Sequence, residues 1–435
     1  MTNAKWERMI EIMKTDVVPA TGCTEPVSLA FAAATAAREL GEPVQSIEAR
    51  VSANLMKNGM GVMVPGTGRP GLYIAAAVGA LGGDPSKDLQ VLNGIPADII
   101  EAGKQMVDTG LVTVGIAREV PNVLYSEALV KGKEHSVKAC IADSHTNVIR
   151  IEKDGEVIFN AEQAEDNSLE EKNAFLNGLS VKEIIEFAEN VPLEQVDFMK
   201  QAEALNDALS KEGLTGKYGL AIGCALQRKQ EKGLVGKDLM NEVVIRTVAA
   251  SDARMGGAPL PAMTNSGSGN QGISATEPVV VVADYVKASD EDRLRAMVLS
   301  HMMAIYTHSF LPKLSALCAT LTASMGSASG MAWLLDREHA EQTISNAICS
   351  MTGDAIGMVC DGAANSCSMK VVTSVSSAYR SVMLALDNIR VGGDDGLVAH
   401  DVDECVRNVG CLACQGMKVT DDEILNIMLH KNKGC

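Results

Sequence analysis

Two Thr-Glu-Pro segments, at 24–26 and 276–278, each precede a run rich in alanine and valine, and a cysteine stands before only the first. A threonine hydroxyl caps free backbone N–H groups, a carboxylate suits the positive end of a helix, and proline is tolerated in the first turn. Both segments therefore predict helix starts, with Cys23 and Ala275 just outside them. A thiol at a helix N-terminus has a lowered pKa, which makes Cys23 a candidate for chemistry.

The chain has 11 cysteines, an odd number that fits a complete disulfide framework poorly. In a reducing compartment this leaves metal binding, catalysis or plain burial. Cys360 and Cys367 lie seven residues apart in CDGAANSCSMK, and Cys318 lies 42 residues upstream. This wide spacing is unlike a zinc finger but suits iron–sulfur ligands that the fold brings together, with buried core thiols as the alternative.

The segment GSGNQG at 267–272 matches the glycine pattern of dinucleotide sites, but a loop with two prolines precedes it where such a site needs a strand. We interpret it as a set of backbone N–H groups and small side chains that receive a substrate carboxylate. The alternative is a tight turn between helices. The residues expected there are Ser266, Gly267, Ser268, Gly269, Asn270 and Gln271.

Two histidines, His301 and His308, lie seven residues apart on one face of a predicted helix. Each is either a hydrogen-bonding side chain of the core or a proton carrier. The histidines match no zinc spacing such as H-E-x-x-H.

The elements that must position these residues are of two kinds. Residues 5–15 and 24–40 are predicted helices, and nearly everything from 169 onward is helical. Between them, residues 46 to about 160 combine short strands and turns with predicted helices at 70–81 and 96–109. We therefore predict an α+β protein. Its large, mainly helical catalytic domain comprises residues 1–45 and 165–435, and a smaller α+β domain is inserted at 46–164.

Composition excludes several classes of protein. A net charge of −17 without clustered lysine or arginine argues against nucleic-acid binding. The longest apolar runs, near 27–37 and 278–287, are too short to span a bilayer, and the N-terminus has no secretory signal. We expect a soluble cytoplasmic protein, and a homo-oligomer such as a dimer on general grounds.

Five motifs together, TGCTEPVSLA, MKNGMGVMVPGTG, SDARMGGAPLPAMTNSGSGNQG, ATEPVV and CDGAANSCSMK, resemble the L-cysteine desulfidase family. That family is related to the iron–sulfur L-serine dehydratases through their α-chain, and the resemblance runs from about residue 10 to 430. It implies a [4Fe–4S] enzyme that eliminates hydrogen sulfide from L-cysteine, giving pyruvate and ammonia without pyridoxal phosphate. The small-molecule partner would be an amino acid.

The resemblance also implies roles for individual residues. Cys318, Cys360 and Cys367 would be the cluster ligands, which leaves one iron open as a Lewis acid. Cys23 would be the base, and either Cys435 or Cys23 the fourth ligand at rest. Cys405, Cys411 and Cys414 do not map to the family's ligands and are taken as structural. Glu25 and Glu277 would bind the substrate ammonium or cap their own helices, and Lys57 and Asn58, in a motif that resembles the family's, are taken as substrate-binding.

Three other functions remain open at this point. L-Serine deamination differs only in the leaving group. An iron–sulfur sensor would hold a cluster without turnover. A binding protein without metal would use only the carboxylate site.

Overall fold

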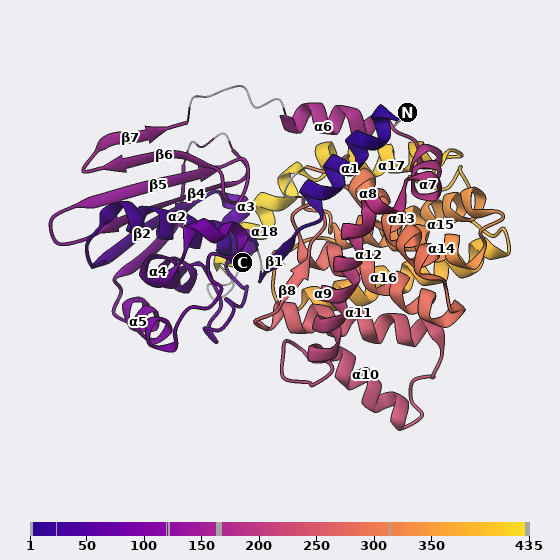
Figure 1. Ribbon diagram of the computed structural model, residues 1–435, viewed down its shortest axis with the longest axis horizontal. Helices are drawn as coiled ribbons and strands as arrows, with labels where there is room; N and C mark the ends of the chain where they lie inside the picture. Colours follow the sequence, from indigo (N-terminus) through magenta and orange to yellow (C-terminus); the bar gives the residue numbers. More distant parts are fainter. Residues whose placement is uncertain are drawn as a thin grey trace.

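The computed structural model describes residues 3–22, 24–118, 120, 122–161, 168–312 and 315–430. It confirms the α+β class: a layer of strands with helices on one side lies beside a larger, mainly helical body (Figure 1). No helix among the described residues is both long enough and apolar enough to cross a membrane.

A mixed six-stranded sheet forms the smaller body, in the order β3-β2-β4-β5-β6-β7. Only β2 and β3 run parallel; the other neighbours are antiparallel. The turn between β6 and β7 is Asp154-Gly155, both at positive φ, as the Asp-Gly pair predicts. The strands are β2 (Ser46–Val51), β3 (Val112–Ile116), β4 (Tyr125–Lys131), β5 (Ser136–Ala142), β6 (Val148–Lys153) and β7 (Glu156–Asn160).

Helices α2 and α4 cover one face of this sheet and cross closely, because a Cβ on Gly79 would lie only 2.4 Å from the Ala30 carbonyl oxygen. The sequence pattern places residues 24–40 with the helical domain. In the structure their apolar side chains share a core with the strands instead. The helices of this body are α2 (Thr24–Leu40), α3 (Ala53–Gly59), α4 (Leu72–Gly82), the 3-10 helix η1 (Pro85–Gln90) and α5 (Ala97–Asp108).

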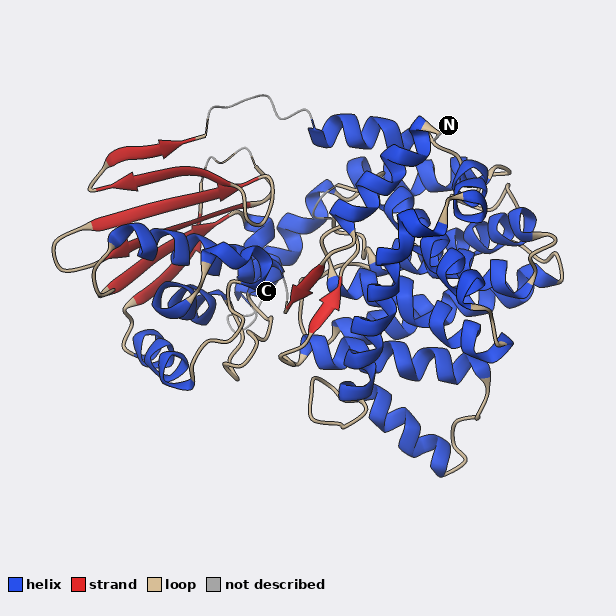
Figure 2. Cartoon of the chain, in the orientation of Figure 1, coloured by secondary structure: helices blue, strands red, loops and turns tan. Residues whose placement is uncertain are grey.

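The larger body is a bundle whose inner helices, α12, α13 and α14, are buried almost all round (Figure 2). Its first helices are α1 (Ala4–Asp16), α6 (Ser168–Asn177), α7 (Val181–Asn190), α8 (Leu193–Val196), η2 (Asp197–Met199), α9 (Lys200–Gly213), α10 (Ile222–Glu231) and α11 (Leu239–Met255). The others are α12 (Gly269–Val286), α13 (Asp290–His308), α14 (Thr320–Leu335), α15 (Ala340–Ala355), α16 (Cys367–Leu386), α17 (Val402–Cys411), the π-helix η3 (Leu412–Gly416) and α18 (Lys418–His430).

A two-stranded ribbon joins the N-terminal segment to the helical body. Strand β1 (Pro19–Thr21) pairs antiparallel with β8 (Pro261–Met263), and the two arrows lie between the two bodies (Figure 2). The ribbon brings the start of α2 to the loop that precedes α12.

The second Thr-Glu-Pro segment does not start a helix, contrary to the sequence-based prediction. Helix α12 already begins at Gly269, and Pro278 lies inside it. The helix that contains this proline is enclosed by neighbouring helices, and next to the proline the Ser300 hydroxyl donates to the Ala275 carbonyl at 2.6 Å. The first segment behaves as predicted, since α2 begins at Thr24.

Candidate active site

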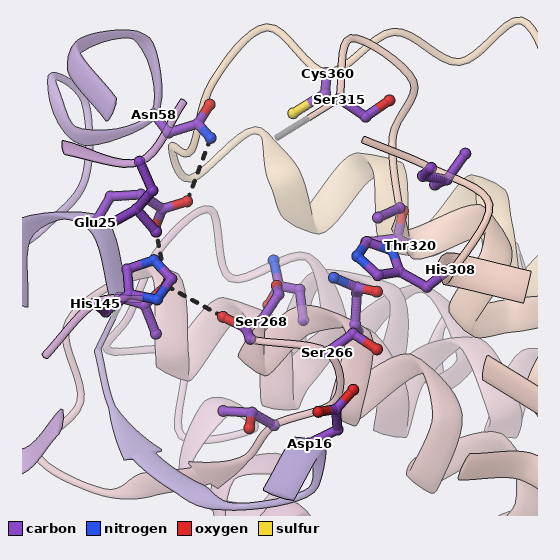
Figure 3. Close-up of a pocket in the computed structure, with 18 of the residues that line it drawn as sticks. Asp16, Glu25, Asn58, His145, Ser266, Ser268, His308, Ser315, Thr320 and Cys360 are labelled. Carbon is purple, nitrogen blue, oxygen red and sulfur yellow. Dashed lines mark hydrogen bonds between the residues drawn. The ribbon is translucent and has the colours of Figure 1, made fainter. Parts of the chain in front are cut away.

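A cavity of about 530 Å³ lies where the sheet body meets the helical body. Glu25, Asn58 and His145 enter it from the sheet body, with His145 on the loop between β5 and β6, while His308 lies opposite them (Figure 3). Between the two sides lie residues of the glycine segment. The predicted residues that line the cavity are Glu25, Asn58, Ser266, Gly267, Ser268, Asn270, Gln271, Cys318, Cys360 and Cys367.

The start of α2 is held against the glycine segment. The Thr24 hydroxyl lies 3.1 Å from the Gly267 carbonyl oxygen and 3.3 Å from the Glu25 carboxylate. The other carboxylate oxygen of Glu25 accepts a hydrogen bond from the Asn58 amide at 3.3 Å. Burial raises the pKa of Glu25 above its ordinary value, although these hydrogen bonds oppose the rise. Cys23 itself, the predicted base, lies outside the described residues.

The glycine segment contains both a tight turn and a helix start. Asn265 and Ser268 exchange backbone hydrogen bonds of 3.1 and 3.0 Å, and the residues between them, Ser266 and Gly267, have φ of 48° and 83°. Helix α12 follows at once. A Cβ on Gly272 would lie 1.9 Å from the Met263 carbonyl oxygen, so glycine is required where α12 meets β8.

A buried hydrogen-bond network connects the turn at 265–268 to helix α13. The Asn265 amide donates to His301 Nδ1 at 3.2 Å and to the His301 carbonyl at 3.1 Å. The opposite ring nitrogen, Nε2, lies 3.0 Å from the Thr276 hydroxyl. Burial lowers the pKa of His301 to about 3, so the ring is neutral. His301 is therefore a hydrogen-bonding residue of the core, one of the two roles that the sequence left open.

The three cysteines predicted as cluster ligands come from two neighbouring loops and one helix start. Cys318 N donates to the Met358 carbonyl at 2.9 Å and Cys360 N to the Ala316 carbonyl at 2.7 Å, which aligns their loops side by side. Cys367 is the first residue of α16. Burial, together with the nearby Cys360 thiol, raises the pKa of Cys318 to about 11.

Two cations lie near these thiols. Lys370 is largely buried, and burial by itself would lower the pKa of its ammonium group. The ion pair with Asp361 outweighs this effect and raises the pKa, and the nearby Cys318 and Cys360 raise it further. Burial raises the pKa of Cys367, while the Ala364 N–H group and the charges of Lys370 and Arg254 oppose the rise. Positive charge beside a group of thiols favours their thiolate forms, which are the forms that bind metal.

A single metal ion and a polynuclear cluster require different arrangements of these thiols. Within the described ranges, no three His, Cys, Asp or Glu side chains converge closely enough to hold one metal ion. In a four-iron cluster the thiolates bind separate irons, so its ligands surround the cluster rather than one point. All three thiols line one cavity, near two cations, and the Ala364 N–H group contacts the Cys367 sulfur at 3.5 Å.

Three of the predicted substrate residues, Glu277, Lys57 and Gly269, do not line the cavity. Glu277 is fully buried inside α12, with Arg246 Nε 3.9 Å from its carboxylate, and burial raises its pKa to about 8. Lys57 is 1% exposed, and its ammonium is bound by Asp421 and by the Cys360 carbonyl. The interior position of Glu277 follows from the early start of α12. Gly269, also predicted to bind substrate, packs against Arg254.

The cysteines predicted to be structural lie away from the cavity. Cys405 is fully buried, with its sulfur 3.5 Å from that of Cys349, whereas Cys411 and Cys414 are exposed. Cys435, a predicted fourth ligand, falls outside the described residues.

Several cavity residues were not predicted to bind substrate from the sequence. Lys172 on α6 binds the Asp16 carboxylate at 2.6 and 2.7 Å. His308 lines the cavity, and burial, with the nearby charge of Lys172, lowers its pKa to about 4. Arg254, near the end of α11, also lines the cavity. The motif SDARMGG that contains Arg254 was a signal, but nothing in it distinguishes this arginine from a surface one.

Comparison with known proteins places the chain among full-length relatives. A protein of Chromobacterium violaceum named UPF0597 protein is 55% identical over 426 residues, 98% of either chain. A UPF0597 protein of Actinobacillus pleuropneumoniae serotype 5b is 53% identical over 427 residues, again 98% of each. The UPF0597 protein YhaM of Shigella sonnei is 51% identical over 430 residues, 99% of this chain and 98% of the relative.

A family model described as the serine dehydratase alpha chain matches residues 91–426. The match includes the three clustered cysteines, the glycine segment and nearly all of the helical body. The chain belongs to the serine dehydratase alpha-chain family.

Proposed function

We propose that the protein is a [4Fe–4S]-dependent lyase that converts L-cysteine to pyruvate, ammonia and hydrogen sulfide. The observation that carries this proposal is the meeting of Cys318, Cys360 and Cys367 on one cavity that also receives the start of α2 and the glycine turn. Membership of the serine dehydratase alpha-chain family supports β-elimination as the reaction class.

In this proposal the three thiolates hold the cluster, and Lys370 and Arg254 offset part of its negative charge. When bound with one iron open, such a cluster supplies a Lewis acid for the departing group. The fourth ligand at rest is proposed to be Cys435 or Cys23.

Elimination also requires a base for the α-proton, and Cys23 is proposed for it. Thr24, the next residue, lies at the cavity and contacts Gly267, so the start of α2 faces the glycine turn. A thiol at this helix N-terminus is favoured as thiolate. On the opposite wall, the neutral His308 is a second group able to carry a proton.

L-Serine is the second candidate substrate, because the matching family model is named for serine dehydratase. The same residues would act in the same roles, and hydroxide would leave in place of hydrosulfide. The motifs that resemble the desulfidases favour cysteine.

The test uses protein purified without oxygen and with its cluster reconstituted. L-Cysteine and L-serine are supplied separately, and pyruvate is measured together with sulfide. Equal pyruvate and sulfide from cysteine, with little pyruvate from serine, is the expected result. Pyruvate mainly from serine would assign the protein to the dehydratases. Bound iron without pyruvate from either amino acid would overturn the proposal and favour a sensor.

A further inference from the structure

We propose that Arg254 is the residue that binds the carboxylate of the substrate, and that Gln271 and Asn58 accept hydrogen bonds from its ammonium group. The cavity would then select α-amino acids by both charged groups. This inference rests on the proposed function in so far as it takes the cavity to be the place where an amino acid binds.

Arg254 is a buried cation that has no carboxylate within ion-pair distance among the described residues. The charge of the buried Glu25 carboxylate acts on it without forming such a pair, since Arg254 lowers the pKa of Glu25 against the larger effect of burial. The Arg254 side chain is 5% exposed, its Nε has no hydrogen-bond partner, and its Nη1 contacts the Met255 sulfur at 3.4 Å. Among the described residues, no carboxylate forms an ion pair with it. A buried charge is costly unless it is paired, so an unpaired guanidinium on a cavity wall indicates an anionic ligand.

Arg246 shows how the same fold treats an arginine that has no ligand to bind. It lies earlier on the same helix, α11, and its side chain is 19% exposed. Its guanidinium binds Asp284 at 2.8 Å and Asp207 at 3.1 Å. The fold therefore places carboxylates in direct contact with a structural arginine of this helix, whereas among the described residues none lies within ion-pair distance of Arg254.

The surroundings of Arg254 favour an incoming anion. A Cβ on Gly269 would lie 2.2 Å from Arg254 Nε, so the absence of a side chain at Gly269 leaves room for the guanidinium. Gly269 is also the first residue of α12. The negative C-terminal end of α11 stabilises the positive charge of Arg254, whereas the positive N-terminal end of α12 beside it repels that charge. A carboxylate bound here would interact favourably with the guanidinium and with α12 together.

Unpartnered acceptors on the same cavity complete the match to an amino acid. Gln271 and Asn58 are 4% and 7% exposed, and the side-chain oxygen of each has no hydrogen-bond partner. The Asn58 amide already donates to Glu25, which leaves its oxygen for a donor from the ligand. Because an ammonium group only donates hydrogen bonds and a carboxylate only accepts them, one unpaired donor and two unpaired acceptors fit a zwitterion.

The test measures binding of three small probes to the reconstituted holoenzyme. L-Alanine has both charged groups but no leaving group, propionate has only the carboxylate, and ethylamine has only the ammonium. We expect the thermal midpoint of the wild-type protein to rise most with L-alanine and less with propionate. In Arg254→Gln, affinity for L-alanine should fall roughly 100-fold and the response to propionate should disappear, because two charge-assisted hydrogen bonds are lost.

Two further variants keep the test decisive if Arg254→Gln does not fold. Arg254→Lys retains the charge but not the paired donors, and should recover part of the affinity. Gly269→Ala displaces the guanidinium without removing it, and should also weaken L-alanine binding. The matched controls are Arg380→Gln, at an exposed ion pair with Asp354, and Gly115→Ala, where a Cβ meets nothing within 4 Å. Both controls should bind as the wild type does.

The outcomes separate this inference from the proposed function. With turnover, Arg254→Gln should raise KM far more than it lowers kcat, with iron content unchanged. Unchanged L-alanine affinity in an Arg254→Gln variant that turns over cysteine would overturn the inference alone. Loss of iron from Arg254→Gln, without a change in probe binding, would also overturn it, since the guanidinium would then serve the thiols. A wild-type protein that binds L-alanine through Arg254 but produces no pyruvate would support the inference and refute the proposed activity.

Discussion

The ammonium of Lys57 lies 2.5 Å from the Asp421 carboxylate, although the two residues are 364 positions apart in the chain. Lys57 belongs to α3 of the sheet body and Asp421 to the C-terminal helix α18. The same ammonium donates to the Cys360 carbonyl at 3.2 Å. One buried cation thus connects the sheet body, the last helix and the loop that carries a predicted cluster ligand.

Breaking this pair should destabilise the protein. In Asp421→Asn the Lys57 ammonium, 1% exposed, loses its counter-ion, and we expect unfolding free energy to fall by about 3 kcal/mol. The double variant Lys57→Met with Asp421→Leu should recover most of this loss, because no charge is left buried. Urea denaturation measures both. Asp84→Asn, at an exposed pair with Lys87, is the control and should change stability little.

Replacement of a cluster ligand should remove iron as well as activity. We expect Cys360→Ser, reconstituted without oxygen, to bind substantially less iron than the wild type and to lack its visible absorption. Cys224→Ser is the matched control, because Cys224 lies on α10, outside the cavity lining. A Cys360→Ser protein that retains four irons would remove Cys360 from the ligand set.

The proposed base can be tested apart from the ligands. Cys23→Ser should keep its iron and lose pyruvate formation, since a serine hydroxyl is far less acidic than a thiol. Exchange of the substrate α-proton in deuterated water, followed by NMR, reports the base directly. Undiminished exchange in Cys23→Ser would transfer this role to another group, of which His308 is the first candidate.

Stability should depend on pH through Glu277. Burial raises the pKa of its carboxyl from 4.5 to about 8 in the folded protein, so the folded state holds a proton that the unfolded state releases. The contribution of Glu277 to stability is therefore present below pH 4.5 and decreases as pH rises toward about 8. Glu277→Gln does not titrate, and its advantage over wild type should reach the order of 4 kcal/mol at pH 8.

Urea unfolding of both proteins between pH 5 and pH 8 checks this expectation. Glu156→Gln, on the exposed strand β7, serves as the control and should follow the wild-type pH dependence. Parallel curves for Glu277→Gln and the wild type would show that the Glu277 carboxyl titrates normally in the folded state.

Local signals predicted local structure well. The start of α2 at Thr24 and the turn at Asp154-Gly155 depend on residues within a few positions of each other, and both appear as expected. The Thr276-Glu277-Pro278 segment carries the same start signal as Thr24 but lies within α12. There the packing against neighbouring helices determines the conformation, and the local sequence does not indicate that packing.

The site was predictable where a motif names its residues and not where long-range contacts define them. Cys360 with Cys367 and the glycine segment are continuous motifs, whereas Cys318 lies 42 residues upstream of Cys360, and the structure brings all of them to one cavity. Lys57 forms an ion pair with Asp421, whereas no described carboxylate forms one with Arg254. Both facts depend on residues hundreds of positions apart. Spacing and composition carry no information on such pairs.

The packing of α2 determines which cavity-lining residues would be transferred together if segments were exchanged between relatives. Its body shares a core with the strands, while its first residue contacts Gly267 of the other half of the molecule. A chimera that exchanges residues 24–160 between two relatives would thus carry Glu25, Asn58 and His145 as one cassette, and leave the thiols and Arg254 with the recipient. We expect the preference of such a chimera for one amino acid over another to depend on both the exchanged segment and the recipient.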